Sequence, residues 1–428
     1  MESIIIRGGT CLSGDVRVEG AKNSALKLMA AALLAPGTTR ITNVPDIADV
    51  DIMAEVLTHL GAVVTRADHS LEIDASNITS YETPYELVVK MRASIAVLGP
   101  LVARFGEARV AMPGGCNIGS RKIDMHISGL EKLGVAISFG HGYIHAVAPK
   151  NGLTPAKVTL GFPSVGATEN LLTAAVVANG TTVIENAARE PEIVDLCEFL
   201  NKMGARITGA GSSTISVEGV SELHPAEHAV VGDRVEAGTF LVAGALCNGP
   251  VTVRGFAPEH LGIVLDKLRD AGCELETGED WVRISLAGRP KPVDIQTLPF
   301  PGFPTDMQAQ FMSLMALADG GSIITENVFE NRFMLADELG RMGADIRIEG
   351  HHALVKGVER LSGAPVQSPD LRGGAALVIA GLAAEGLTSV GDVYHIDRGY
   401  ERFTDKLAAL GADIKRSCEP ADYSSTGA

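Results

Sequence analysis

One short ending recurs six times along the 428-residue chain, and this repeat limits the possible folds more than any other feature. In each copy a helix-like segment ends at a glycine and an alternating stretch follows it; the glycines are Gly61, Gly134, Gly204, Gly272, Gly343 and Gly411. Subtracting their residue numbers gives spacings of 73, 70, 68, 71 and 68. Such a regular repeat indicates a fold made of six similar supersecondary units.

Each unit is predicted to be close to βαβαββ. A first Ala-rich segment closes on a glycine and is followed by a β-branched stretch, as in NLLTAAVVANGTTVI, which indicates a buried helix, a stop and a strand. A second helix is amphipathic, as in EPEIVDLCEFLNKMGA, and ends at the repeated glycine, which can adopt the left-handed conformation common at helix ends. Two short alternating stretches complete the unit.

Three units per domain would give two similar α/β domains, with strands outside and apolar helices in the middle. The segment LHPAEHAVVGDR, around residues 223 to 234, interrupts the pattern between them. Tandem stacking as a solenoid is the alternative, but the first helices are apolar on all sides, which does not suit an array of one layer.

Composition excludes several classes of partner. A net charge of -16 argues against a general nucleic-acid or anionic-membrane surface, so any anion site must be local. Six scattered cysteines without a CxxC pair, and the absence of a leader or a membrane-length apolar run, predict a cytoplasmic protein with free thiols. His141 and His145 are the nearest candidates for a metal site, but their hairpin-like context favours a plain strand face.

Charged residues gather where helices are predicted to begin. First helices start at Lys22-Asn23, Arg92, Ser164 to Asn170, Arg234 to Glu236, Asp306 and Asp370 to Arg372, and second helices near Arg121, Glu190, Arg332 and Arg398. A helix N-terminus already carries partial positive charge, so basic residues there indicate an anionic ligand and not compensation of the helix dipole. The alternative is that each arginine pairs with a nearby acid, such as Glu190 or Asp370.

One cysteine has unusual surroundings. Cys116 lies in the Gly-rich segment PGGCNIGSRKID, with Arg121 and Lys122 just beyond it. Fixed positive charge stabilises a thiolate, which predicts a reactive thiol. The common nucleotide and hydrolase signatures, GxxxxGK[ST], the dinucleotide pattern and GxSxG, are missing from the chain.

Several segments together resemble the UDP-N-acetylglucosamine 1-carboxyvinyltransferase family of enolpyruvyl transferases. They are GAKNSALKLMAAALL, PGGCNIGSRKIDMHI, SVGATENLL, NAAREPEIVDL, DRVEAGTFLVAGA, PFPGFPTDMQAQF, FENRFMLADEL and HIDRGYERFTDKLAALGA. The resemblance implies a two-domain inside-out α/β barrel built from six βαβαββ repeats. It also implies one domain of residues 22–229, a second of residues 1–21 plus 230–428, and an active site in the cleft between them.

The same resemblance implies a reaction. Phosphoenolpyruvate would give its enolpyruvyl group to the 3-hydroxyl of UDP-N-acetylglucosamine through a tetrahedral intermediate, with release of phosphate, as the first committed step of peptidoglycan precursor synthesis. No metal or organic cofactor is expected, and a monomer is the expected state. Both substrates are anionic, as the charged helix starts also indicate.

The resemblance further implies roles for individual residues. Lys22, Cys116, Asp306 and Arg398 would be catalytic: Asp306 would take the proton from the sugar hydroxyl, and Cys116 would serve in proton delivery, adduct formation and product release, and be the fosfomycin target. The expected phosphoenolpyruvate ligands are Lys22, Arg121 and Arg398, supported by Arg92 and Arg372. The expected contacts to the sugar nucleotide are Asn23, Arg121, Lys122, Ile123, Asp124, Met125, Ser164, Val165, Gly166, Asp306 and Val328. Residues expected to support these or to act in closure are Glu190, Asp233, Glu236, Arg332 and Asp370.

Two of these expectations contain an open choice. Asp370 could orient Arg372 or simply cap its helix. For Cys116, positive surroundings favour a nucleophile over a proton donor in the free enzyme, so its protonation is predicted to depend on bound substrate.

Three rival functions stay open on sequence grounds. The chain could act on shikimate 3-phosphate, although GAKNSAL and the cysteine segment replace that enzyme's Ser-rich phosphate motif. It could be a paralogue that modifies another nucleotide. From a different class, it could be a sensor that binds sugar nucleotides without catalysis, and phosphate release would separate this possibility from the others.

Overall fold

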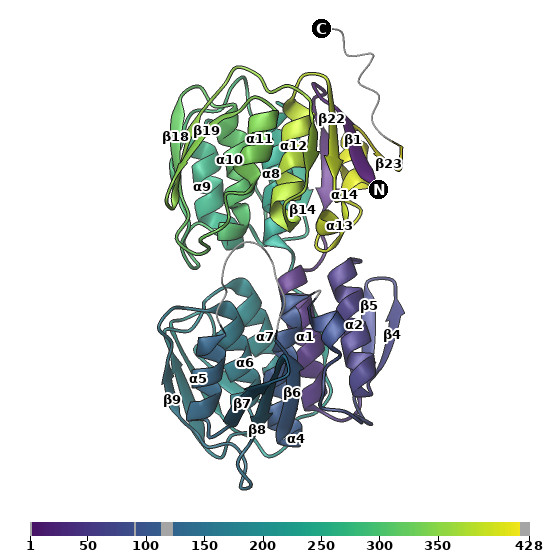
Figure 1. The fold of residues 1–428 in the computed structure, drawn as a ribbon, viewed down its shortest axis with the longest axis vertical. Coiled ribbons are helices and arrows are strands. Elements are labelled where there is room, and N and C mark those ends of the chain that lie inside the picture. Colours follow the sequence, from purple (N-terminus) through teal and green to yellow (C-terminus); the bar gives the residue numbers. More distant parts are fainter. Residues whose placement is uncertain (1, 90, 113–122, 420–428) are drawn as a thin grey trace. The chain divides into compact units, whose positions relative to one another are not determined.

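The chain folds into two units, which we describe separately (Figure 1). A computed structural model describes residues 2–89, 91–112 and 123–419. Residues 2–19 and 232–419 form unit 1, and the described residues between 20 and 231 form unit 2. Along the described residues, the chain passes from one unit to the other between Glu19 and Gly20 and between Val231 and Gly232.

Unit 1 contains three four-stranded sheets, ordered β21-β22-β1-β23, β15-β16-β14-β2 and β17-β18-β20-β19. Their strands are β1 (Ser3–Arg7), β2 (Gly14–Arg17), β14 (Val251–Arg254), β15 (Glu274–Thr277), β16 (Trp281–Ser285), β17 (Ile295–Gln296), β18 (Gly321–Thr325), β19 (Asp345–Glu349), β20 (His352–Lys356), β21 (Pro365–Gln367), β22 (Leu387–Gly391) and β23 (Asp413–Ser417). The helices are α8 (Arg234–Leu246), α9 (Gly262–Asp270), α10 (Gln308–Ala316), α11 (Leu335–Arg341), α12 (Leu371–Ala383), α13 (Tyr394–Asp397) and α14 (Phe403–Ala409), with 3-10 turns η3 (Pro258–Leu261) and η4 (Thr305–Met307).

Unit 2 repeats this plan with sheets β13-β3-β5-β4, β6-β8-β7 and β11-β12-β10-β9. Its strands are β3 (Thr38–Thr42), β4 (Val63–Ala67), β5 (Ser70–Asp74), β6 (Glu107–Ala111), β7 (Ala136–Gly140), β8 (Tyr143–Val147), β9 (Lys157–Thr159), β10 (Thr181–Glu185), β11 (Arg206–Thr208), β12 (Thr214–Glu218) and β13 (Glu227–Ala229). Its helices are α1 (Lys22–Ala31), α2 (Ala48–Leu60), α3 (Tyr85–Val88), α4 (Leu98–Phe105), α5 (Asp124–Lys132), α6 (Val165–Ala175) and α7 (Pro191–Lys202), with 3-10 turns η1 (Ala32–Leu34) and η2 (Arg92–Val97).

The sheets share one pairing pattern. Five of them contain a parallel pair, β2 with β14, β13 with β3, β9 with β10, β17 with β18 and β21 with β22. In the β6 sheet an isolated parallel bridge, Glu82 to Arg109, takes the same place. Strands β2 and β13 are exchanged: β2 precedes α1 but pairs with the strand after α8, and β13 precedes α8 but pairs with the strand after α1. The first strand, β1, lies between β22 and β23 in unit 1.

The predicted repeat has a direct structural counterpart. All six repeated glycines adopt positive φ, from 90° at Gly134 to 108° at Gly61, which is the left-handed region that a residue with a Cβ rarely enters. The central helices are buried as predicted, and every residue of α8 and α10 is buried. Because α8, α10 and α12 contact one another pairwise, the first helices close a core instead of stacking as a solenoid.

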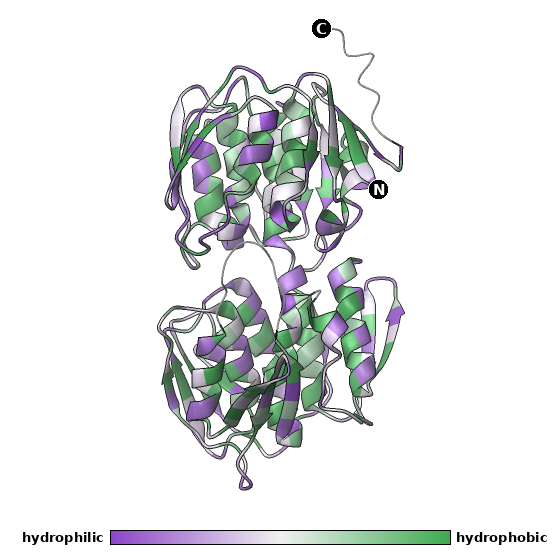
Figure 2. Cartoon of the chain, in the orientation of Figure 1, coloured by the Kyte–Doolittle hydropathy of each residue, from purple (hydrophilic) through white to green (hydrophobic). Residues whose placement is uncertain are grey.

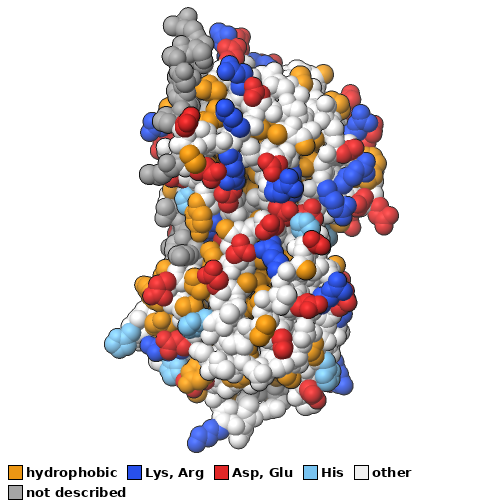
Figure 3. All heavy atoms as spheres, turned by 90° about the vertical axis from the view of Figure 1, so that its right-hand side faces the viewer, with side chains coloured by type: hydrophobic (Ala, Val, Ile, Leu, Met, Phe, Trp, Pro, Cys, Tyr) orange, Lys and Arg blue, Asp and Glu red, His pale blue; other side chains and the backbone are white. Residues whose placement is uncertain are grey.

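Hydropathy follows this layering (Figure 2). One apolar core fills each unit, and strands such as β5 and β12 alternate between buried and exposed residues. On the face drawn in Figure 3, acidic and basic side chains are interspersed. Exposed ion pairs of unit 1 include Arg7 and Asp413, whose Nε and Oδ2 atoms lie 3.7 Å apart. Among the residues that the structure describes, no helix is both long and apolar enough to cross a membrane.

Three predicted helix starts differ in detail. Arg92 and Asp306 lie in the 3-10 turns η2 and η4, which lead into α4 and α10. In α4, Pro100 lacks the N–H that would bond back into the preceding turn, so that turn does not continue the α-helix. Arg398 does not begin a helix; it is the C-cap of the short α13, and α14 begins only at Phe403, after Arg402 has taken a left-handed conformation.

Candidate active site

Aspartate side chains cap the N-termini of two central helices of unit 1. Asp370 Oδ1 accepts hydrogen bonds from Arg372 N at 2.8 Å and Gly373 N at 3.1 Å. Asp233 caps α8 in the same way, through Val235 N and Glu236 N. A cap satisfies donors that the helix itself cannot. Of the two roles considered for Asp370, the structure therefore shows the helix cap.

Asp306 lies between two guanidinium groups. Arg332 Nη2 is 2.7 Å from Asp306 Oδ1, and Arg372 Nη2 is 3.2 Å from Oδ2. The Asp306 side chain is 23% exposed, whereas both arginine side chains are 4% exposed. The two cations stabilise the ionised carboxylate, which is the form that can accept a proton, and the exposure leaves the carboxylate accessible.

Arg372 is charged but only partly paired. Burial by itself would lower the pKa of its guanidinium, but Tyr400, Asp306 and Asp233 together raise that pKa above its ordinary value. The guanidinium carbon lies 5.3 Å from the centre of the Tyr400 ring. Within the described residues, its Nε and Nη1 atoms are buried and have no hydrogen-bond partner. A buried cation with two unused donors suits a planar anion.

Sequence reasoning missed Glu326, which organises this region. Its Oε1 accepts hydrogen bonds from Thr297 Oγ1, Val328 N and Phe329 N at 2.8 to 3.0 Å, and its Oε2 accepts one from Thr305 Oγ1 at 2.8 Å. Arg332 Nη1 in turn donates to Thr305 Oγ1 at 2.9 Å. Glu326 thus holds the segments that carry Asp306 and Val328.

A second ion pair in unit 1, between the partly buried Lys406 and the buried Glu236, joins α8 to α14. Lys406 Nζ lies 2.8 Å from Glu236 Oε1, and burial raises the pKa of Glu236 to about 7, although Lys406 opposes the rise. Arg398, one of the predicted phosphoenolpyruvate ligands, is half-buried in this unit.

In unit 2, Lys22 begins α1 and pairs with an acid that sequence reasoning did not single out. Its Nζ lies 2.7 Å from Asp49 Oδ2, in the first turn of α2, and the two side chains are 10% and 1% exposed. The next residue, Asn23, is exposed. The lysine is therefore anchored while the start of the helix stays accessible.

The structure also brings two of the predicted sugar-nucleotide segments together. Helix α5, which starts at Asp124, contacts α6, whose N-cap Ser164 accepts a hydrogen bond from Ala167 N. A Cβ on Gly166 would lie 3.2 Å from His126 Nε2, so the two helix starts meet there. Ile123, Met125, Ser164 and Val165 are half-buried near this contact.

His126 is buried and neutral at this contact. Asn170 Nδ2 lies 2.9 Å from His126 Nδ1, so Nδ1 acts as the acceptor. Burial, with smaller contributions from Arg92 and Lys27, lowers the pKa of His126 to about 4. Lys27 is itself paired with the buried Glu169, at 2.7 Å, and burial raises the pKa of that carboxyl. Glu190 forms the N-cap position of the neighbouring α7.

The low pKa of His126 predicts a loss of stability in acid. In the unfolded chain the imidazole binds a proton below its ordinary pKa of 6.5, but in the folded unit only near 4, so lowering the pH through this window favours unfolding. We expect a loss of ~3 kcal/mol between these pH values. Denaturant titrations over this range should show that the free energy of unfolding falls with decreasing pH in the wild type and in the exposed control His141→Asn. In His126→Asn the free energy of unfolding should depend less on pH. Equal slopes in the wild type and His126→Asn would contradict the assignment.

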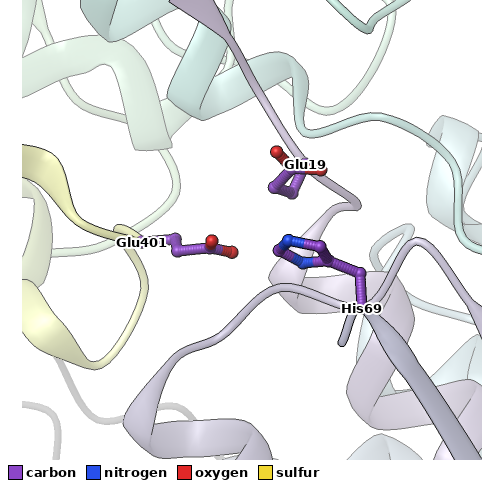
Figure 4. Close-up of side chains that lie close together, drawn as sticks. All are labelled: Glu19, His69 and Glu401. Atoms are coloured by element: carbon purple, nitrogen blue, oxygen red, sulfur yellow. The ribbon is translucent and has the colours of Figure 1, made fainter. Parts of the chain in front are cut away.

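Three predicted residues, Cys116, Arg121 and Lys122, lie outside the described residues. For the metal expectation, His145 lies on β8, and its Nε2 is 2.8 Å from Oε1 of Glu107 on the paired strand β6, which fits a strand-face residue. Figure 4 labels Glu19 and Glu401 of unit 1 and His69 of unit 2. His69 Nδ1 lies 3.1 Å from Val44 O within its own unit, and we assign these three residues no site.

Comparisons with known proteins agree on one family. The protein family described as EPSP synthase (3-phosphoshikimate 1-carboxyvinyltransferase) matches residues 6–407 of the chain. UDP-N-acetylglucosamine 1-carboxyvinyltransferase from Corynebacterium jeikeium is 55% identical over 97% of this chain and 99% of its own length. The protein of that name from Trichlorobacter lovleyi is 53% identical over 98% and 100%.

Solved structures share the fold. The enolpyruvyl transferase NikO from Streptomyces tendae has a TM-score of 0.88 and 29% identity, over 98% of this chain and 99% of its own. EPSP synthase from Acinetobacter baumannii has a TM-score of 0.77 at 18% identity, over 97% and 100%, which shows a shared fold.

Proposed function

The chain belongs to the EPSP synthase family of carboxyvinyltransferases, and from this premise we propose that it transfers the enolpyruvyl group of phosphoenolpyruvate to the 3-hydroxyl of UDP-N-acetylglucosamine. The observation that carries the proposal is identity of 53 to 55%, over nearly the whole length of both chains, to relatives named for that reaction. The reaction supplies a precursor of peptidoglycan.

The reaction proceeds in two steps, an addition and an elimination. The sugar hydroxyl oxygen bonds to C2 of phosphoenolpyruvate while the hydroxyl proton passes to a base and a proton is added to C3, giving a tetrahedral intermediate. The C2–O bond to phosphate then breaks as C3 loses a proton, which gives the enol ether and inorganic phosphate. A base, an acid and cations for the anionic groups are sufficient for this sequence.

We assign the base to Asp306, because it is accessible and kept ionised by Arg332 and Arg372. The unused guanidinium donors of Arg372 and the anchored Lys22 support roles as anion ligands. Arg92 and Arg398, both half-buried, stay proposed members of the same set. The role of Cys116 in proton delivery and as the fosfomycin target stays a prediction, as does the catalytic use of a cleft between domains.

The rivals are less well supported. The solved EPSP synthase shares 18% identity with the chain, against 53 to 55% for the UDP-N-acetylglucosamine relatives. Against a sensor without catalysis, the chain retains Lys22, Cys116, Asp306 and Arg398. A cytoplasmic location and a monomeric state complete the proposal.

The deciding experiment measures phosphate release from phosphoenolpyruvate with UDP-N-acetylglucosamine, with shikimate 3-phosphate and without an acceptor. We expect release only with the first acceptor. Release only with shikimate 3-phosphate would transfer the assignment to that reaction. No release with either acceptor, together with binding of UDP-N-acetylglucosamine, would favour the sensor.

A further inference from the structure

The first turn of α1 presents Lys22 and Asn23, yet it has no capping side chain. Three other central helices, α6, α8 and α12, are capped by Ser164, Asp233 and Asp370. At the N-cap of α1 stands Ala21, which offers no acceptor. Since Lys22 is proposed to bind substrate, the structure must fix this turn in another way.

Asp195 on the neighbouring α7 supplies that fixation (Figure 1). Its carboxylate is buried; Ser24, in the first turn of α1, donates its hydroxyl to Oδ2, and Val231 N donates to the same oxygen at 3.2 Å. Ala21 N in turn donates to Val231 O at 2.7 Å. One carboxylate therefore ties the first turn of α1 to the end of the segment that follows β13.

His228 and Lys202 hold the other side of this carboxylate. His228 is 4% exposed, with Nε2 2.7 Å from Asp195 Oδ1 and Nδ1 2.9 Å from Lys202 Nζ. A lysine ammonium only donates, so Nδ1 must accept, and the ring proton is on Nε2, which donates to Asp195. The carboxylate of Asp195 therefore accepts three hydrogen bonds, from Ser24, Val231 and His228.

We propose that Asp195, oriented by His228, is a positioning residue that acts through Ser24 to hold Lys22 and Asn23 in place. The inference rests on the proposed function, in which those two residues meet the substrates. Small displacements of a group that must meet a reacting molecule reduce rates strongly, so the hydrogen bonds behind α1 matter for turnover even though none of their members touches substrate.

The test compares Ser24→Ala, Asp195→Asn, His228→Phe and His228→Gln. The amide nitrogen of glutamine can replace the Nε2 donor, but phenylalanine offers no donor. We expect kcat/KM for phosphoenolpyruvate to fall about tenfold in the first three variants and to be largely restored in His228→Gln.

Amide hydrogen exchange gives a second readout that does not depend on activity. The first turn of α1 should exchange about tenfold faster in the three impaired variants, while the capped start of α8 stays unchanged. Glu198→Gln, an exposed acid on the same helix as Asp195, and His224→Gln, an exposed histidine near His228, are the matched controls.

Each result has one meaning. If Ser24→Ala and Asp195→Asn keep the wild-type kcat/KM and the wild-type rate of amide hydrogen exchange in the first turn of α1, the positioning role is overturned and the proposed function is not affected. Equal losses in His228→Gln and His228→Phe would overturn the part assigned to the Nε2 donor. If wild-type enzyme releases no phosphate, the proposed function fails, and the exchange of α1 still decides the positioning role. If Asp195→Asn does not fold, Ser24→Ala, which loses a single hydroxyl, decides whether the hydrogen bond to α1 positions Lys22.

Discussion

Replacing Asp306 by asparagine is expected to lower kcat for acceptor-dependent phosphate release by about a thousandfold. General base catalysis contributes on the order of a hundred- to ten-thousandfold, and the amide cannot take the proton of the sugar hydroxyl. The substitution keeps the volume of the side chain and an oxygen facing Arg332, so the unit should fold. It places the NH₂ group toward Arg372, which adds a smaller loss because two donors then face each other.

The measurement is steady-state phosphate release, with calorimetric binding of UDP-N-acetylglucosamine to show that the site is intact. The matched control is Asp319→Asn, an exposed aspartate of the same unit, which should behave as the wild type. A kcat within fivefold of the wild type in Asp306→Asn would show that another group is the base. Loss of binding with kcat retained at saturation would make Asp306 a ligand and not a base.

Local pattern was enough to predict the repeat and the starts of most helices. A helix stop at a left-handed glycine depends on neighbouring residues, so the six glycines and the buried helices between them could be read from the sequence. The same holds for Asp370, which caps the helix that its own position indicates. The residue pattern predicts a helix start near Arg398, but α14 begins only at Phe403. The left-handed conformation of Arg402, which comes just before this helix, cannot be predicted from the local pattern.

Partners distant in the sequence could not be predicted in this way. Lys22 was identified, but Asp49, which neutralises it, sits on another helix. Ser24 and Asp195 are 171 residues apart, and Glu326 bonds to segments 21 and 29 residues away. The sequence pattern shows which side chains carry charge. Only the packing of α1 on α7, and of the 3-10 turn η4 near β18, decides which charges meet.

Replacing Arg372 by lysine tests whether the unused donors beside Asp306 serve an anion. Lysine keeps the positive charge but loses the planar fork, so it cannot offer Nε and a terminal nitrogen to one carboxylate or phosphate together. Each hydrogen bond lost to a charged group costs about 1.5 to 3 kcal/mol, so losing both contacts of the fork corresponds to a hundredfold or larger loss in kcat/KM for phosphoenolpyruvate.

Stability should respond differently from activity in this variant. In the free protein the buried Nε and Nη1 donors of Arg372 have no partner within the described residues, and such donors destabilise the folded state. Arg372→Lys removes them while a cation stays near Asp306 and the Tyr400 ring, so the melting temperature should stay within a few degrees of the wild type while kcat/KM collapses. The control for replacing an arginine by a lysine is Arg402→Lys, at an exposed arginine of the same unit that pairs with Asp405. If kcat/KM for phosphoenolpyruvate in Arg372→Lys stays within threefold of the wild type, the unused donors do not bind that substrate, and Arg372 only holds Asp306.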